Sequence, residues 1–586
     1  MVTKMEPCEA PHTLLGFLLH KDQPGSRICR AEEDFHFFRD YAIREINVLL
    51  WVSLILITGL LLRKVARLLR LWAKGRKIPG PPCSSFYGHV KLISGGKSGE
   101  TLTEFLSKSH EQYGSIVKLW LGPTQLLVSI KDLSIIKEML VKAEDRLPLT
   151  GRVFRLAFGY SSLFVPSFEK VRKRRESLAI QLNGRLIERA NAIPSKVVDY
   201  VMERIHSLMS KGVHDCRSVS QHMAFSILGA TLLGDGFLSW SNATVYEELL
   251  MMIAKDASLW ASYKVTPLWK RGFWRYQVLC KRLKCLTQDF IRQCRQNCKL
   301  FSQMDENTHS ETTTVGRDTA CGVFCAGFDM EDDLLLDEFN GHHDAREEPC
   351  GNIMGVMFHG CLTTAGLIGD ILTRLVMHPE IQEKIYSEIV KVWKRSSKLE
   401  LEDIYKMQFL LATVYESARL LPGPLLQRCS LKHDLNLQEG ITVPAGAIMV
   451  VPVQLVQMDG SHWGSDANQF NPYRFLSKAE QGSDSVPLSP LSPFAGVGEK
   501  LNAADVPFVL NDPNANAAFL PFGSGTRACV GQKIAILGIT TLFASLLKQY
   551  EIKLHPGSEN DPKPTMKNCV LQPLPSPKII FVRRND

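Results

Sequence analysis

One cysteine of this 586-residue chain lies in a glycine-rich segment directly before an apolar stretch that predicts a helix. Residues 519–538 run FLPFGSGTRACVGQKIAILG and place Cys529 two residues after Arg527. A cysteine beside a cation and among the N–H groups of a helix N-terminus favours the thiolate, which can act as a nucleophile or a metal ligand. Arg527 can pair with an anionic group nearby. Glycines let the backbone pass close to a large flat group, and three flank the cysteine: Gly523, Gly525 and Gly531.

A second notable segment is the apolar stretch between Pro349 and Pro379. Proline fits just inside the start of a helix and just beyond its end, so these two prolines predict one long helix. The stretch is apolar nearly all round, which predicts a buried, central helix. Polar residues interrupt it and argue against a membrane span; they are Asn352, His359, Asp370 and Arg374.

Residues 46–62 form an uncharged apolar run of seventeen residues, near the lower limit of roughly 17 to 25 for crossing a bilayer. Seven basic residues and no acid follow in residues 63–77, whereas residues 1–45 are nearly balanced in charge. The positive-inside bias then predicts a transmembrane anchor with everything after Leu62 in the cytoplasm. A cleaved signal peptide would need these flanks reversed. Residues 1–45 are an extension of unknown role.

The remaining chain predicts a large folded body. A basic and proline-rich hinge is expected over residues 63–82, because IPGPP at 78–82 stiffens the backbone. Residues 113–129 predict a β-hairpin broken at Gly122-Pro123, and the pattern beyond is mainly helical. Two polar or Pro/Gly/Ser-rich stretches, near 301–349 and 476–518, are predicted to be insertions.

Composition narrows the function classes. Hydrophobic residues make up 45% and charged residues 22%, which excludes a mainly disordered, collagenous or coiled-coil protein. The 69 Lys+Arg and 60 Asp+Glu give a net charge of +9, too diffuse over this length to indicate nucleic-acid binding. Fifteen scattered cysteines do not form a disulfide pattern and indicate a reducing compartment. Length alone suggests three or four domains.

The cysteine segment resembles the heme-binding loop of the cytochrome P450 family, F-x-x-G-x-R-x-C-x-G, at all five fixed positions. Those positions are Phe522, Gly525, Arg527, Cys529 and Gly531. The resemblance implies that Cys529 is the thiolate ligand of heme iron and that the other four residues bind the cofactor, heme b (iron protoporphyrin IX). Cytochrome P450 enzymes are a known example of cysteine-ligated heme. The resemblance covers the chain from about Ile78 to its C-terminus. It implies one catalytic domain, residues 83–586, in place of the three or four domains that length alone suggests.

Two further motifs stand in the family's order. Glu416 and Arg419 form E-x-x-R on one helix face, and Arg474 lies in a segment that resembles P-x-R-F. The resemblance implies a buried Arg-Glu-Arg network that holds the fold and takes no part in catalysis. Residues 441–454 resemble the family's paired strands, and Arg428 stands where the family commonly contacts a heme propionate; a surface arginine is the alternative.

The long central helix resembles the family's oxygen-binding helix, (A/G)-G-x-(D/E)-T-(T/S). Gly360, Thr363 and Thr364 match, whereas His359 replaces the small residue and Leu362 replaces the acid. Glycine beside threonines can open a helix locally, because threonine offers competing hydrogen bonds. The resemblance implies that Thr363 passes protons to dioxygen. The missing carboxylate removes a proton relay, and His359 is either its substitute or a core residue.

Residues 167–175 resemble the helix that usually carries W-x-x-x-R. Arg172 takes the arginine position of a heme contact, but Phe168 stands in place of the tryptophan and lacks its N–H donor. The five basic residues of this segment form either a docking face for an acidic flavoprotein or a solvated charged surface.

The resemblance implies a mainly α fold with small β-sheets (α+β) in the endoplasmic reticulum membrane, facing the cytoplasm. Its implied activity is that of a monooxygenase that takes electrons from NADPH through a reductase, NADPH-cytochrome P450 reductase or similar, and oxidises a lipophilic small molecule. Two alternatives stay open. One is a reductase-independent isomerase or dehydratase, suggested by His359 and Leu362, and the other is a non-catalytic heme-binding protein.

Overall fold

The structure is a computed structural model, and it divides into two compact units, Met1–Trp72 and Ala73–Asp586. It describes residues 27–83, 88–89, 102–142, 144–145, 194–209, 214–233, 235–262, 269–306, 351–393, 399–421, 426–429, 433–437, 440–476, 518–523, 528–556 and 577–584. The division falls inside the predicted hinge of residues 63–82.

A single long helix, α2 (Arg27–Gly75), contains the predicted membrane anchor. Its stretch Tyr41–Gly75 is long and apolar enough to cross a bilayer, and large side chains such as Trp51 and Ile55 are exposed along it. The helix also runs through the basic segment of residues 63–75, where the sequence predicted the start of a hinge. The reason is that residues 63–74 contain neither proline nor glycine and are rich in good helix formers.

Residues 78–82 open the second unit at the edge of a sheet. The backbone N–H of Lys118 donates to the carbonyl of Pro79 at 2.8 Å, and the side chain of Ile78 is buried. A Cβ on Gly80 would lie 2.5 Å from the carbonyl oxygen of Lys118, so only glycine fits this close approach.

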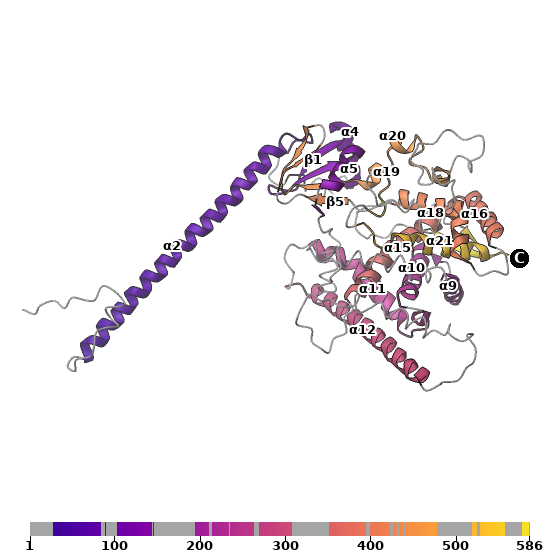
Figure 1. Ribbon diagram of the computed structural model, residues 1–586, viewed down its shortest axis with the longest axis horizontal. Helices are drawn as coiled ribbons and strands as arrows, with labels where there is room; N and C mark the ends of the chain where they lie inside the picture. Colours follow the sequence, from indigo (N-terminus) through magenta and orange to yellow (C-terminus); the bar gives the residue numbers. More distant parts are fainter. Residues whose placement is uncertain are drawn as a thin grey trace, which may run out of the picture. The chain divides into compact units, whose positions relative to one another are not determined.

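A five-stranded sheet has the order β1-β2-β8-β5-β3. Its strands are β1 (Ile116–Trp120), β2 (Leu126–Ile130), β3 (Glu144–Asp145), β5 (Leu426–Cys429) and β8 (Ile448–Val451). β1 and β2 form the predicted antiparallel hairpin, which turns at Gly122 with φ +75°, while β2 pairs with β8 in parallel. Figure 1 shows this sheet beside α4 (Leu102–Tyr113) and α5 (Leu133–Lys142).

The predicted pairing within residues 441–454 is wrong. β7 (Thr442–Val443) pairs with β6 (Leu435–Asn436) in a two-stranded sheet, whereas β8 lies in the five-stranded sheet. The four residues of β8 are all buried, so packing between β2 and β5 determines its place. A third sheet joins β4 (His214–Asp215), β10 (Lys578–Arg583) and β9 (Tyr550–Leu554).

Helices make up most of the described residues of the second unit, so the predicted mainly α fold with small sheets is confirmed. The remaining helices are α9 (Pro194–Met209), α10 (Cys216–Leu233), η1 (Asp235–Phe237), α11 (Ala243–Ser262), α12 (Arg271–Glu306), α15 (Gly351–Met377), α16 (Pro379–Val392), α17 (Leu401–Lys406), α18 (Gln408–Leu420), α19 (Val453–Gln457), α20 (Gly460–Trp463), η3 (Pro472–Phe475) and α21 (Gln532–Gln549). Residues 301–306 of the first predicted insertion belong to α12. Residues 307–349 and 477–517 lie outside the described residues.

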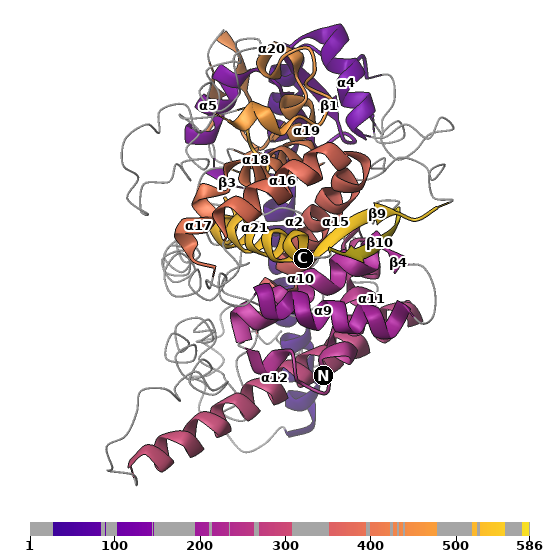
Figure 2. The same ribbon diagram turned by 90° about the vertical axis from the view of Figure 1, so that its right-hand side faces the viewer.

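α15 is the predicted central helix, and it runs between the two prolines as expected. It packs against α10, α16, α18 and β9, and most of its side chains are buried. Figure 2 shows α16, α18 and α21 side by side across the middle of this unit. The carboxylate of Glu388 on α16 accepts hydrogen bonds from the N–H groups of Phe409 and Leu410, and thereby caps the start of α18.

Gly229 marks the closest helix contact in the core. A Cβ there would lie 1.9 Å from the ring of Phe237 in η1. That ring is held by Phe225 and Phe290 at centroid distances of 5.1 and 5.7 Å. Gly229 is therefore a position where η1 crosses α10 without room for a side chain.

We expect Gly229→Ala to lower the free energy of unfolding by about 1 to 3 kcal/mol, the usual cost of overpacking. The control is Gly366→Ala on α15, where a Cβ meets nothing within 4 Å. A helical alanine there should instead raise stability by about 0.5 to 1 kcal/mol. Thermal or urea unfolding checks both; equal effects of the two substitutions would contradict the packing argument.

Candidate active site

The cysteine segment forms a tight backbone loop ahead of α21. The N–H of Cys529 donates to the carbonyl of Phe522 at 2.8 Å, and the N–H of Gly523 donates to Leu520 at 3.1 Å. Gly523 has φ +72°, a left-handed conformation that favours glycine. α21 begins two residues after Val530, with Gly531 as its N-cap. The cysteine is thus placed just before a helix N-terminus, as the sequence predicted.

The surroundings of Cys529 leave room for a large group. Its side chain is exposed, and a Cβ on Gly531 would meet nothing within 4 Å. The next residue, Gln532, is buried, yet neither polar atom of its side-chain amide has a hydrogen-bond partner within the described structure. Phe522 packs against the main core and fixes the base of the loop. Gly525 and Arg527 lie outside the described residues.

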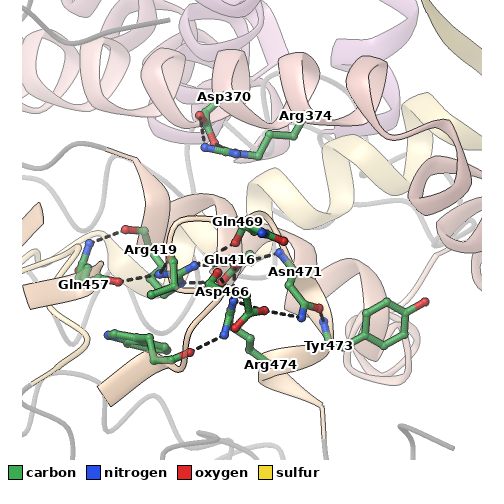
Figure 3. Close-up of polar contacts among 12 residues, drawn as sticks. Asp370, Arg374, Glu416, Arg419, Gln457, Asp466, Gln469, Asn471, Tyr473 and Arg474 are labelled. Carbon is green, nitrogen blue, oxygen red and sulfur yellow. Dashed lines mark hydrogen bonds and ion pairs between the residues drawn. The ribbon is translucent and has the colours of Figure 1, made fainter. Parts of the chain in front are cut away.

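A buried cluster joins Glu416 and Arg419 on α18 with Arg474 on η3, as Figure 3 shows. Arg419 donates to both carboxylate oxygens of Glu416, at 2.7 and 2.8 Å, and the Nε of Arg474 lies 3.4 Å from Oε1. The side chains of Glu416 and Arg419 are fully buried. The predicted Arg-Glu-Arg network is therefore present.

The remaining donors of the cluster also find partners. Arg419 donates to the backbone carbonyls of Gln457 and Ala467, at 2.6 and 2.7 Å. Arg474 binds the carboxylate of Asp466 at 2.5 Å. Burial alone would raise the pKa of Asp466, but hydrogen bonds from Arg474 and Asn471 outweigh it and hold the pKa below its ordinary value. Two cations therefore face two carboxylates, of which Glu416 is fully buried and Asp466 is partly exposed.

Thr363 is exposed, although the helix around it is buried. Within residues 353–376 of α15 it is the one exposed residue, so the helix borders open space at this point. Its hydroxyl donates to the carbonyl of His359 at 2.8 Å. Thr364 is 8% exposed, and a Cβ on Gly360 would lie 3.1 Å from Leu228 on α10.

The helix opening expected at Gly360 is not observed, because α15 is continuous from Gly351 to Met377. The carbonyl of His359 has two lone pairs, so the threonine hydroxyl can bind it without displacing the helical hydrogen bond.

Among the described residues of α15, no acid lies within seven positions after Leu362. Leu362 packs against an apolar cluster between α10, α11 and α12. The next carboxylate along α15, Asp370, is bound by Arg374 at 2.7 and 3.2 Å, and burial raises its pKa. Burial also lowers the pKa of His359 to about 4, so its imidazole is neutral at neutral pH. His359 is partly exposed as a residue, but its Nε2 is buried, and the neutral ring carries no charge toward Thr363.

Two predicted cofactor contacts remain predictions. Arg428 lies in β5, where its backbone pairs with Met449 and Asp145, but its side chain is not among those described. Arg172, Phe168 and the basic residues around them lie outside the described residues.

Sequence reasoning missed Asp466 and Gln457, which complete the cluster. The sequence pattern does not single out Gln457, because the otherwise apolar run VPVQLVQ that ends α19 contains two amides, Gln454 and Gln457.

Comparison with known proteins shows the family of this chain. Residues 78–581 match the family described as Cytochrome P450. Cytochrome P450 734A1 of Arabidopsis thaliana is 23% identical over 91% of this chain and 95% of its own length. Cytochrome P450 4V2 of Pongo abelii is 23% identical over 84% of this chain and 87% of its own length. Cytochrome P450 734A5 of Oryza sativa subsp. japonica is 29% identical, but the match spans only 38% of this chain and 36% of that protein.

The chain belongs to the cytochrome P450 family, and the resemblance seen in its sequence is confirmed. It is by family an oxidoreductase that uses heme. The observed residues fit this cofactor, since Cys529 is accessible, Gly531 leaves open space and Gln532 presents an unsatisfied amide. Cys529 would hold the iron. The roles of Phe522, Gly525, Arg527 and Gly531 remain predictions.

The lowered pKa of His359 predicts a pH dependence of stability. The ordinary pKa of 6.5 applies to His359 in the unfolded chain, and the folded value is about 4. As pH falls from 6.5 to 4, the unfolded chain binds a proton that the folded protein does not, so stability decreases. The loss contributed by this residue is roughly 3 kcal/mol, and it is absent above pH 6.5.

We therefore expect His359→Leu to flatten the fall in unfolding free energy between pH 6.5 and 4, measured by urea unfolding. Met377→Leu, at an exposed position of the same helix, is the control; it changes no ionisable group and should leave the slope as in the wild type. An unchanged slope in His359→Leu would show that His359 is not a buried neutral group.

Proposed function

We propose that this protein is a membrane-anchored heme-thiolate monooxygenase of lipophilic small molecules. The observation that carries the proposal is the accessible thiol of Cys529, held by its backbone ahead of α21 within a complete heme-binding motif. The reaction consumes the substrate RH, O2, NADPH and H⁺, and yields ROH, H2O and NADP⁺. The two electrons pass from NADPH through a reductase, NADPH-cytochrome P450 reductase or a similar donor.

Heme bound through Cys529 supplies the oxygen chemistry, because a thiolate ligand donates electron density that favours O–O cleavage. The chain's own residues position the substrate and move protons. The hydroxyl of Thr363 both donates to the carbonyl of His359 and faces open space, so it can exchange a proton there. A lipophilic substrate is proposed because α2 would hold the protein at a bilayer, where apolar molecules concentrate.

Cys529→Ser should abolish the thiolate-type spectrum of the reduced carbon monoxide complex, because an alcohol is a far weaker ligand than a thiolate. The matched control is Cys285→Ser, which removes another exposed thiol on α12. We expect its spectrum to equal that of the wild type. A thiolate-type spectrum that persists in Cys529→Ser would exclude this ligand and the proposed reaction.

A second candidate function is isomerisation or dehydration of an oxygenated substrate without reductase. It is favoured by Leu362, which supplies no carboxylate, and by the neutral imidazole of His359. The accessible hydroxyl of Thr363 favours the monooxygenase. A non-catalytic heme protein would bind ligands without consuming NADPH.

Thr363→Ala should lower product formation per NADPH consumed by roughly 10²-fold or more, as expected when a proton donor is removed. Thr373→Ala is the matched control, since Thr373 makes the same 2.8 Å bond to the carbonyl four residues earlier on α15 but is buried. Turnover should require NADPH and reductase in both variants. Product that forms without them would establish the isomerase or dehydratase.

We infer that α2 anchors the protein in the endoplasmic reticulum membrane with the catalytic domain in the cytoplasm. Support comes from the exposed apolar stretch within Tyr41–Gly75 and from the basic residues that follow Leu62. An Asn-X-Ser acceptor added ahead of residue 1 should be glycosylated in cells, whereas one added after residue 586 should not. The reverse pattern would overturn the orientation.

A further inference from the structure

Gln457 joins the buried cluster to the segment that carries the cysteine. It is the last residue of α19 and is fully buried. Its side-chain N–H donates to the carbonyl of Arg419 at 2.6 Å, while its side-chain oxygen accepts from the N–H of Leu520 at 3.0 Å. Its own backbone carbonyl accepts from the guanidinium of Arg419 at 2.6 Å. One amide therefore contacts both α18 and the start of the cysteine loop.

The hydrogen bonds continue from Leu520 to Cys529. The carbonyl of Leu520 accepts from the N–H of Gly523, and the carbonyl of Phe522 accepts from the N–H of Cys529. Glycine is frequent in this loop, so few side chains are available to hold it by packing. Phe519 does pack against the rings of Phe475 and Trp463, but apolar contact fixes direction less strictly than hydrogen bonds do.

We propose that Gln457 is a positioning residue that holds the Cys529 loop at the distance and orientation needed for thiolate ligation. The proposal rests on the proposed function, because it assumes that Cys529 binds heme. Its physical basis is that a buried N–H and a buried carbonyl, those of Leu520 and Arg419, would both lose their partner if the amide were removed. The loop would then shift to satisfy them, and the sulfur would move with it.

The test compares reduced carbon monoxide spectra of heme-loaded Gln457→Leu and wild-type protein. Leucine is apolar and of similar size, so it removes both side-chain hydrogen bonds without leaving a large cavity. We expect the ratio of non-thiolate to thiolate complex to rise at least about tenfold, as loss of buried hydrogen bonds implies. Gln457→Glu keeps an acceptor for the N–H of Leu520 and loses the donor to the carbonyl of Arg419. Its ratio of non-thiolate to thiolate complex should therefore lie between those of the wild type and Gln457→Leu.

Gln382 on α16 provides a matched control. It is also a buried glutamine, and it donates to the carbonyl of Ile552 at 3.0 Å and accepts from the N–H of the same residue at 2.7 Å. Those bonds hold β9, not the cysteine loop. Gln382→Leu should lower the melting temperature about as much as Gln457→Leu, but its folded fraction should keep the wild-type ratio of complexes.

A wild-type ratio in both Gln457 variants would overturn the proposal and leave Gln457 a structural residue. The same conclusion follows if Gln382→Leu changes the ratio as much as Gln457→Leu. If Gln457→Leu does not fold, the ratio measured in Gln457→Glu takes its place. Amide hydrogen exchange at Leu520 in the wild type is the second measurement, and rapid exchange there contradicts the proposal. Wild-type protein without a thiolate complex would instead refute the proposed function.

Discussion

The buried carboxylate of Glu416 is the interaction on which the described catalytic unit depends most. It receives Arg419 and Arg474 on its oxygens and the backbone N–H of Asn471 at 2.9 Å. Removing one member of such a cluster leaves an uncompensated buried charge, which costs about 3 to 5 kcal/mol. Because the arginines also bind carbonyls of residues 457–469, the cluster fixes a segment that has little regular structure of its own. Gln457 then extends the connection to Leu520 and the cysteine loop.

The groups proposed to act in catalysis belong to two helices that the apolar core holds in place. α21 presents the cysteine loop at its N-terminus, and α15 presents Thr363 as an exposed residue within a buried helix. α18 packs against both helices, and it also carries Glu416 and Arg419. α18 therefore holds the cysteine loop through polar contacts that pass by way of Gln457, and it holds α15 through apolar contacts. The lack of a carboxylate at position 362 leaves Thr363 as the described hydroxyl suited to proton transfer.

Features that depend on local pattern could be predicted from the sequence. The hairpin of β1 and β2 and the limits of α15 set by Pro349 and Pro379 are present. The burial of Glu416 with Arg419 and Arg474 is also present, but it was expected from the family resemblance and not from local pattern. Features that depend on distant partners could not be predicted. β8 lies between β2 and β5, two strands that are far apart from each other in the chain. Gln457 gains its role only because Arg419 and Leu520 both lie within hydrogen-bond distance of its side chain. The expected opening of α15 fails because the threonine hydroxyl shares the carbonyl of His359.

The most direct test of this account is X-ray absorption at the iron edge of the purified, heme-loaded ferric protein, since it distinguishes sulfur from nitrogen or oxygen in the first coordination shell. The account predicts one sulfur ligand per iron in the wild type and in Cys285→Ser, and none in Cys529→Ser. An iron site with only nitrogen and oxygen ligands in the wild type would contradict it, as would a sulfur ligand retained without Cys529.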